Sequence, residues 1–206
     1  MKKKKLFLFD FDGVIVDSFA FYRESSGRCF EKMGINSAAT RDDFLDFFED
    51  NFYVALTKRG IDIAEFGRVA KQVGPTVDSS TIVPFYNVVP VLETLGKDNV
   101  LLVVSSNSRK AIDQILSRHN LDRYFDEILG ADFMFSKVDK ITHAMKEWEI
   151  GKKRTYFIGD TAGDIREATE AGVKTVAVTW GWHSKERLIK AAPDYLIEDP
   201  VELLDI

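Results

Sequence analysis

The chain has 206 residues, of which 45% are hydrophobic, so it holds enough apolar material for a buried core and is not a disordered chain. Its formal charge of −5 argues against a surface that coats nucleic acid. The single Cys29 cannot form an internal disulfide, and no apolar run approaches the roughly 18–20 residues that span a bilayer, so we expect a cytoplasmic protein with neither nucleic-acid nor membrane partners.

Five short apolar runs, each rich in β-branched or aromatic residues, are predicted to be strands: residues 6–9, 100–104, 155–158, 175–179 and 195–197. They lack strict alternation, which is typical of strands buried on both faces. Amphipathic helical patterns lie between the later runs, over residues 108–118, 138–148 and 163–171. This alternation predicts an α/β fold with a doubly wound, Rossmann-like parallel sheet, whose strands all end at one edge.

The segment from residue 19 to residue 81 breaks this rhythm, because it contains no strand-like run. Three helical patterns fill it: residues 19–33, residues 40–59 with a capping-box-like start at Thr40, and residues 62–73. Phenylalanine is dense in this segment, which favours a self-contained helical core.

We therefore predict that the segment is a cap domain inserted into the main domain. The helical cap would comprise residues 18–83, and the catalytic core would comprise residues 1–17 and 84–206. Hinges are expected where the chain passes between the two parts, near residues 17–18 and 83–84.

Polar side chains follow three of the predicted strands at the point where each strand ends. They are Asp10 and Asp12 after the first strand, Ser105, Ser106 and Asn107 after the second, and Asp160 and Asp164 after the third. In open α/β sheets, ligands bind at the carboxyl ends of the strands. Because three separate runs deliver polar groups to one edge, we expect a binding site there.

The aspartates at this edge predict a divalent cation. Converging carboxylates repel one another unless a positive charge compensates them. Ligands that are all oxygen favour Mg²⁺ over zinc, and the scattered His119, His143 and His183 form no competing cluster. The candidate metal residues are Asp10, Asp12, Asp160 and Asp164.

Asp10 and Asp12 lie two residues apart, so in an extended chain their side chains share one direction. Such a pair suits a nucleophile and a general acid/base. Taken alone, the pair could equally form an Asx-type turn closed by Gly13. The other polar clusters at the same edge favour the catalytic interpretation.

Ser105, Ser106 and Asn107 precede a predicted helix, whose first turn offers unpaired N–H groups to an anion. Ser106 or Asn107 could instead, or as well, cap that helix. A lysine should neutralise a bound phosphoryl group. Lys137, before the helix predicted at 138–148, is our choice, and Lys140, one turn further along, is the competitor.

These motifs resemble those of the haloacid dehalogenase-like hydrolase superfamily. The family's Asp-x-Asp-Gly motif is similar to Asp10-Phe-Asp-Gly, and its apolar strand ending in Ser or Thr is similar to Val-Val-Ser105. Its Gly-Asp-x-x-x-Asp motif is similar to Gly-Asp160-Thr-Ala-Gly-Asp164. The family lysine matches Lys137. The closest resemblance is to the branch of phosphoglycolate phosphatases and beta-phosphoglucomutases that carries a helical cap, although their frequent Lys-Pro-x-Pro is replaced here by Lys-Val-Asp-Lys.

The resemblance implies a Mg²⁺-dependent phosphatase for a small phosphorylated metabolite, with phosphoglycolate as the first candidate. Asp10 would attack phosphorus and form a phospho-aspartyl intermediate. Asp12 would protonate the leaving oxygen and then activate water. The cap would open for substrate and close to exclude bulk water.

The resemblance also implies how the site binds its ligands. The Asp10 carboxylate, the Asp12 carbonyl and Asp160 would hold Mg²⁺, with Asp164 orienting them. Ser105, the Ser106 amide and Lys137 would hold the phosphoryl oxygens.

Two other functions use the same residues. A phosphosugar mutase of the same superfamily would pass the phosphoryl group to a second sugar hydroxyl. A receiver-like signalling domain would keep a stable phospho-aspartate.

Residues that could contact the leaving group are Tyr22, Arg23, Arg59 and the Trp-Gly-Trp run at 180–182.

Overall fold

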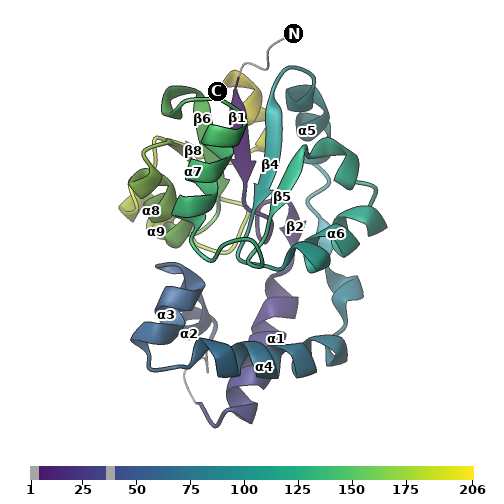
Figure 1. The fold of residues 1–206 in the computed structure, drawn as a ribbon, viewed down its shortest axis with the longest axis vertical. Helices are drawn as coiled ribbons and strands as arrows, with labels where there is room; N and C mark the ends of the chain where they lie inside the picture. The colour runs from purple at the N-terminus through teal and green to yellow at the C-terminus, as the bar shows by residue number, and fades with distance from the viewer. Residues whose placement is uncertain (1–4, 36–39) are drawn as a thin grey trace.

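The computed structural model describes residues 5–35 and 40–206, and its centre is a parallel sheet (Figure 1). The strands are β1 (Leu6–Phe9), β4 (Val100–Val104), β5 (Glu127–Leu129), β6 (Thr155–Gly159), β7 (Lys174–Val178) and β8 (Tyr195–Ile197). They lie in the order β5-β4-β1-β6-β7-β8, and every pairing is parallel. All six strands therefore end at one edge, as predicted.

Strand β1 shows how the sequence builds two layers. Successive side chains of a strand point to opposite faces. Phe7 and Phe9 accordingly join one buried cluster, and Leu6 and Leu8 join another on the opposite face. The first cluster packs against α5 (Val89–Gly96) and α6 (Arg109–Arg118), and the second against α7 (Lys137–Glu147) and α8 (Ala162–Ala171). The predicted doubly wound α/β fold is confirmed.

Some elements of the core were not predicted from the sequence. Strand β5 has only three residues and is recognisable mainly by its pairing with β4. Helix α5 carries Pro90 in its first turn, a position that needs no N–H. Helix α9 (Lys185–Lys190) is a short helix that packs Leu188 against Ile165 and Ala177.

The inserted segment forms four helices in the described part of the chain, α1 (Phe19–Lys32), α2 (Arg41–Leu45), α3 (Phe52–Lys58) and α4 (Ile63–Val73). They lie together below the sheet edge at which the strands end (Figure 1). Their apolar side chains form a buried cluster of their own, which includes Phe30, Phe47, Leu56 and Phe66. The expected role of the phenylalanines in helix packing agrees with this cluster.

The helix predicted over residues 40–59 is instead broken into two helices. The capping box at its start is present, because Thr40 and Asp43 exchange backbone-to-side-chain hydrogen bonds. A 3₁₀ turn over Asp46–Phe48 then interrupts the helix. The side chain of Asn51 accepts a hydrogen bond from the Tyr53 amide and caps α3 as a new helix.

The chain passes between core and insertion at two neighbouring places. Strands β2 (Val16–Asp17) and β3 (Val83–Pro84) pair antiparallel and form a small second sheet. This pairing supports our proposal that the cap comprises residues 18–83, with hinges near residues 17–18 and 83–84. Short 3₁₀ helices also occur at Gly74–Thr76, Ser79–Thr81, Asp122–Tyr124, Lys152–Arg154 and Pro200–Asp205.

Within residues 5–35 and 40–206, no helix combines the length and the apolar character that crossing a lipid bilayer requires.

Candidate active site

Asp10 stands directly after β1 and is held by the sheet itself. Its amide donates to the Ile158 carbonyl of β6 at 2.8 Å, which continues the strand pairing by one residue. One carboxylate oxygen, Oδ1, accepts from the Phe11 amide at 2.7 Å. The other, Oδ2, lies 2.9 Å from Lys137 Nζ. The backbone therefore fixes this carboxylate at the centre of the sheet edge.

Asp10, Asp160 and Asp164 come together at this edge. Each offers a carboxylate oxygen, and these oxygens all lie within 4.8 Å of one another. All three residues are buried, with Asp160 fully inaccessible to solvent. The ammonium of Lys137 contacts both Asp10 and Asp164 and supplies positive charge to the cluster. Asp12, the fourth predicted member, is not part of this three-residue cluster.

Glycines leave the space in which Asp160 lies. Gly13 has a φ of +79°, and a Cβ there would lie 2.0 Å from Asp160 Oδ2. A Cβ on Gly181 would lie 2.2 Å from the Asp160 Cβ. Both positions therefore require glycine, Gly13 also for its left-handed backbone.

The polar atoms around Asp160 and Asp12 fit a bound cation. Asp160 Oδ2 accepts from the Trp182 amide at 2.7 Å, whereas Asp160 Oδ1 and Asp12 Oδ1 are buried and have no hydrogen-bond partner. Buried acceptors without partners are rare, because each loses its hydration for no return. A hard divalent cation such as Mg²⁺ prefers carboxylate oxygens of this kind.

Asp164 belongs to the cluster and to the start of α8. Its amide donates to Thr161 Oγ1 at 3.2 Å, and its Oδ2 accepts from the Thr161 amide at 3.2 Å and the Thr161 hydroxyl at 2.7 Å. These bonds form the capping box of the helix. They leave Oδ1 aimed at Lys137.

Burial and mutual repulsion change the protonation of these groups. Burial, only partly offset by Lys137, raises the pKa of Asp10 from 3.8 to about 6. Burial and the charge of Asp10 raise the pKa of Asp12 from 3.8 to about 7. Burial and the neighbouring carboxylates also raise the pKa of Asp160. Burial alone would lower the pKa of Lys137, but the surrounding carboxylates raise it well above its usual range.

The three residues after β4 lie beside the cluster. Ser105 is buried, and its hydroxyl accepts from the Asn107 amide at 3.1 Å. The Ser106 carbonyl accepts from the hydroxyl of Tyr53 at 3.0 Å. The alternative that Ser106 or Asn107 caps the following helix is wrong, because Ser108 is the N-cap of α6 and accepts from the Ala111 amide at 3.3 Å.

The two candidate lysines have different partners. Lys137 Nζ contacts Asp10 and Asp164, whereas Lys140 Nζ donates to the Ser105 carbonyl at 2.6 Å. Lys140 is fully buried, and burial together with the charge of Lys137 lowers its pKa to about 8. Lys137 is therefore the lysine placed beside the carboxylates, and Lys140 supports the loop that follows β4.

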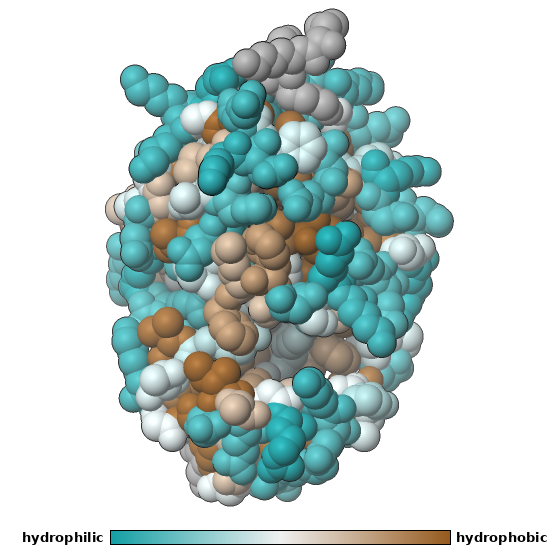
Figure 2. All heavy atoms as spheres, viewed as in Figure 1, coloured by the Kyte–Doolittle hydropathy of each residue, from teal (hydrophilic) through white to brown (hydrophobic). Residues whose placement is uncertain are grey.

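A cavity of about 760 Å³ lies between this cluster and the cap, where Figure 2 shows the surface hollowed. Asp10, Asp12, Lys137 and Asp164 line it, as do Ser105, Ser106 and Asn107. Tyr22 and Trp182 line it too, as suggested for leaving-group contacts.

Two other suggested cap residues lie elsewhere. Arg59 places its guanidinium 4.1 Å from the centre of the Phe47 ring, so it packs within the cap. Arg23 is exposed and does not line the cavity. Trp180 is engaged with the core, where its ring N–H donates to the Val14 carbonyl at 3.2 Å.

Several residues that join the cap to the core were not predicted from the sequence. Glu167 accepts from the Lys137 amide at 2.8 Å and from the Asn51 side chain at 3.1 Å. His183 is buried and bridges the Ala162 amide and the Leu45 carbonyl. These contacts join residues more than 20 positions apart in the sequence, so no local pattern marks them.

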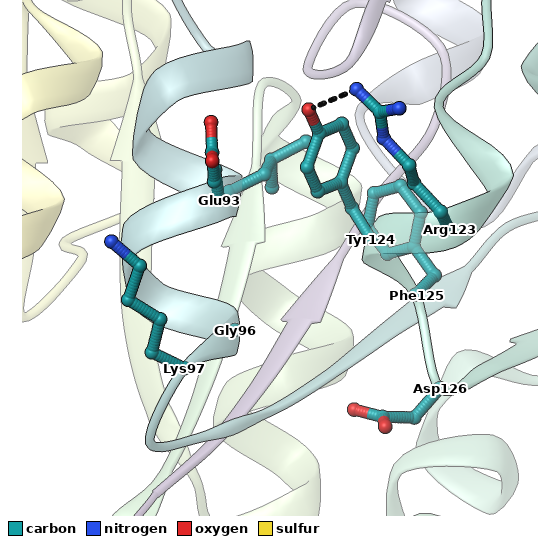
Figure 3. A pocket seen from close by; sticks show the side chains of 8 residues that line it. Glu93, Gly96, Lys97, Arg123, Tyr124, Phe125 and Asp126 are labelled. Carbon is teal, nitrogen blue, oxygen red and sulfur yellow. Dashed lines mark hydrogen bonds between the residues drawn. The ribbon is translucent and has the colours of Figure 1, made fainter.

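A smaller hollow of about 300 Å³ lies elsewhere on the core, between α5 and the turn at residues 122–126 (Figure 3). In it, Arg123 donates to the Tyr124 hydroxyl at 2.9 Å. None of the motif residues lines this hollow, so we place the candidate site at the sheet edge.

The fold and the site together define a doubly wound α/β core whose sheet edge carries a buried carboxylate cluster facing an inserted helical segment. The family model for haloacid dehalogenase-like hydrolases matches residues 7–178 of the chain. The chain therefore belongs to the haloacid dehalogenase-like hydrolase family, and the predicted resemblance is confirmed.

Full-length relatives and solved structures agree with this assignment. The chain is 27% identical to the phosphoglycolate phosphatase of Synechococcus elongatus, over 96% of this chain and 94% of that protein. It is 24% identical to the pyrophosphatase PpaX of Oceanobacillus iheyensis, over 97% and 94%. A haloacid dehalogenase-like hydrolase of Streptococcus pneumoniae has the same fold, with a TM-score of 0.80, 24% identity and coverage of 100% and 99%.

Proposed function

We propose that the protein is a Mg²⁺-dependent phosphatase that hydrolyses a small phosphorylated metabolite through a phospho-aspartyl intermediate on Asp10. The observation that carries the proposal is the buried cluster of Asp10, Asp160 and Asp164 with Lys137 at one sheet edge, facing a cavity. The names of the relatives support a phosphatase and suggest phosphoglycolate as the first compound to test. We also propose that the protein works in the cytoplasm.

Mg²⁺ would be held by Asp10 and Asp160, with the Asp12 carbonyl as a further ligand and Asp164 orienting the set. When bound, the ion withdraws charge from the phosphoryl oxygens and neutralises the carboxylates. The buried Oδ1 atom of Asp160, which has no hydrogen-bond partner, suits such a ligand. Removal of the ion should therefore abolish turnover.

The first chemical step is an attack by a carboxylate oxygen of Asp10 on phosphorus, in line with the bond that breaks. The P–O bond to the leaving group breaks as the new P–O bond to Asp10 forms. Asp12 gives its proton to the leaving oxygen. Its pKa of about 7 suits this role, because the protonated form is still abundant near neutral pH.

In the second step Asp12, now a carboxylate, takes a proton from water. The resulting hydroxide attacks the phosphorus of the acyl phosphate, and Asp10 leaves as a carboxylate. The Ser105 hydroxyl, the Ser106 amide and Lys137 would hold the phosphoryl oxygens during both steps. These groups line the cavity next to Asp10.

Phosphate release from phosphoglycolate and a panel of metabolite phosphates, with Mg²⁺ or with a chelator, tests the proposal. We expect turnover only with the metal, and a rapidly quenched mixture should contain protein heavier by one phosphoryl group. Stable phospho-protein without phosphate release would identify a receiver-like domain instead. Transfer of phosphate to a second sugar hydroxyl would identify a mutase.

A further inference from the structure

The cavity between cap and core extends well beyond the carboxylate cluster. Its volume of about 760 Å³ lies in the upper part of the roughly 300–1,000 Å³ found for pockets that bind drug-sized ligands. Helix α6 lines it from Lys110 to Arg118. At a rise of about 1.5 Å per residue, these positions span about 12 Å. A leaving group of two carbon atoms, as in phosphoglycolate, would fill only a small part of this space.

Small residues of the cap keep the cavity open. Ser25 and Ser26 of α1 and Gly67 and Ala70 of α4 form part of its wall. A Cβ added to Gly67 would meet no atom within 4 Å. Glycine inside a helix destabilises it by about 0.5–1 kcal/mol relative to alanine. Gly67 therefore keeps space free in the cavity wall at a cost to the stability of its helix.

Part of the cavity wall is apolar and aromatic. Phe21 of α1, Phe66 of α4 and Ile115 of α6 line it, and Phe48 and Phe52 add two further rings. Aromatic walls of this kind favour flat apolar groups, which gain from burial and from ring stacking. The short, charged glycolate group would gain little from them.

The charged side chains that line the rest of the cavity are mostly cationic. Outside the carboxylate cluster the described lining cations are Lys71, Lys110 and Arg118. The guanidinium of Arg118 is held in place, because it donates to the Ser79 carbonyl at 2.8 Å. Apart from Asp10, Asp12 and Asp164, the described lining residues include one further carboxylate, Asp50, which already pairs with Lys58 at 2.6 Å. This arrangement favours a second negative group on the substrate.

We propose that the preferred substrate is a phosphate monoester whose leaving group is an extended, flat, apolar body ending in a second anionic group. The inference rests on the proposed phosphatase function. The phosphoryl group binds at Asp10 and Lys137, the flat body lies against the phenylalanines, and the second anion pairs with Lys71, Lys110 or Arg118.

Three aryl phosphates test this inference, since the leaving oxygen is a phenolate in each and intrinsic reactivity stays similar. They are phenyl phosphate, naphthyl phosphate, and a naphthyl phosphate with a carboxylate on the distal ring. With the full chain and saturating Mg²⁺, we expect kcat/KM to rise about fivefold or more at each addition, from burial of the second ring and then from pairing of the carboxylate. Phosphoglycolate is measured alongside and should be the poorer substrate.

A cavity-filling variant tests the steric part. Gly67→Leu should lower the ratio of kcat/KM for naphthyl phosphate over phenyl phosphate by about tenfold, because the leucine occupies space that the second ring needs. Gly27→Leu is the matched control. Gly27 is also a glycine within a helix of the cap domain, and an added Cβ there would meet no atom within 4 Å, but Gly27 does not line the cavity. Its ratio should stay unchanged.

A charge variant tests the second anion. Lys71→Met should lower kcat/KM for the carboxylated naphthyl phosphate by about fivefold, with little change for naphthyl phosphate. Lys146→Met is the control, because Lys146 is also a lysine in the last turn of a helix and is exposed, but lies outside the cavity.

The outcomes separate this inference from the function on which it rests. The inference is wrong if kcat/KM for phosphoglycolate equals that for the carboxylated naphthyl ester, or if the three aryl esters have the same kcat/KM. The proposed phosphatase function would still hold in either case. If no ester shows Mg²⁺-dependent turnover, the proposed function itself fails.

Discussion

The sheet edge of the core and the cap that faces it place their side chains in different ways. At the edge, Asp10 and Asp160 directly follow strands, so strand pairing fixes where they lie. In the cap, the cavity wall depends on how helices pack, through ring contacts such as Phe48 with Trp182 at 4.8 Å. The first kind of position depends on the backbone, and the second on many side chains together.

Polar contacts also join the cap to the core. Arg166 pairs with Glu49 at 3.1 Å and Arg187 with Asp46 at 2.8 Å, and Tyr53 donates to the Ser106 carbonyl. Partly exposed ion pairs contribute about 0–1 kcal/mol each. The cap therefore contacts the core through several weak polar contacts as well as through the packing of Trp182 against Phe44 and Leu45, and we propose that it opens and closes. We expect substitutions at the edge to affect the chemical step most, and substitutions in the cap to affect substrate choice or docking.

The largest effect should come from Asp10→Asn. An amide is a poor nucleophile, so kcat should fall by about 10⁴-fold or more, the scale found when a catalytic nucleophile is removed. Steady-state phosphate release measures kcat, and circular dichroism should show a folded protein. Near-normal metal-dependent turnover in this variant would exclude Asp10 as the nucleophile.

Asp12→Ala should have the next largest effect. Loss of a general acid/base lowers the rate by about 10²–10⁴-fold, which is about 2.7–5.4 kcal/mol of transition-state stabilisation. The measurement compares an ester with a poor leaving group and an aryl ester with a good one. The aryl ester should suffer less, because its leaving oxygen needs less help from a proton. A loss below about tenfold for both esters would argue against the role.

Metal binding should change stability in a way that depends on pH. The pKa values of Asp10, about 6, and Asp12, about 7, exceed the usual 3.8, so the folded state retains protons that the unfolded state releases. Without metal, the free energy of unfolding therefore falls as pH rises from about 4 through 7. At pH 7.5, Mg²⁺ at a hundredfold excess over Kd should stabilise the protein by about 2.7 kcal/mol. The stabilisation should be smaller at pH 5, because Mg²⁺ competes with these protons.

Thermal unfolding with and without Mg²⁺ checks this prediction. Asp160→Asn should remove most of the shift in Tm, since Asp160 is a candidate ligand in the cluster. Glu170→Gln is the control, because Glu170 is an exposed residue of α8 that does not belong to the cluster. An equal shift in both variants would place the ion elsewhere.

The sequence predicted the sheet edge better than the cap because motif residues there are tied to strand ends. The choice between Lys137 and Lys140 as the phosphate lysine could not be made from the sequence, since two residues three apart share one face of a helix. Only their distances to the carboxylates distinguish them. The break between α2 and α3 was not predicted because the apolar stripe continues through it. The new helix start depends on a single side-chain hydrogen bond, by which Asn51 acts as the N-cap of α3. The partners of His183 and Glu167 are distant in sequence, so packing alone brings them together.

The smallest effect concerns His183, which joins the two regions. Its Nδ1 accepts from the Ala162 amide at 3.1 Å, so Nε2 carries the proton and donates to the Leu45 carbonyl at 3.1 Å. Burial lowers the pKa of His183 below its usual 6.5. As pH falls below 6.5, the unfolded state binds a proton that the folded state refuses, so this residue makes the free energy of unfolding fall.

His183→Gln keeps one acceptor and one donor but cannot titrate. We expect its urea midpoint to change less between pH 7.5 and pH 5.5 than that of the unsubstituted protein, with a loss of about 1 kcal/mol or less at pH 7.5. His143→Gln is the control, because His143 contacts the Phe133 ring away from the cap junction. The raised carboxylate pKa values act in the opposite direction in all three proteins, so the difference between them isolates His183. Identical pH dependence in the three proteins would mean that His183 titrates alike in the folded and unfolded states. The contact of His183 with Ala162 and Leu45 would then add nothing to the pH dependence of stability.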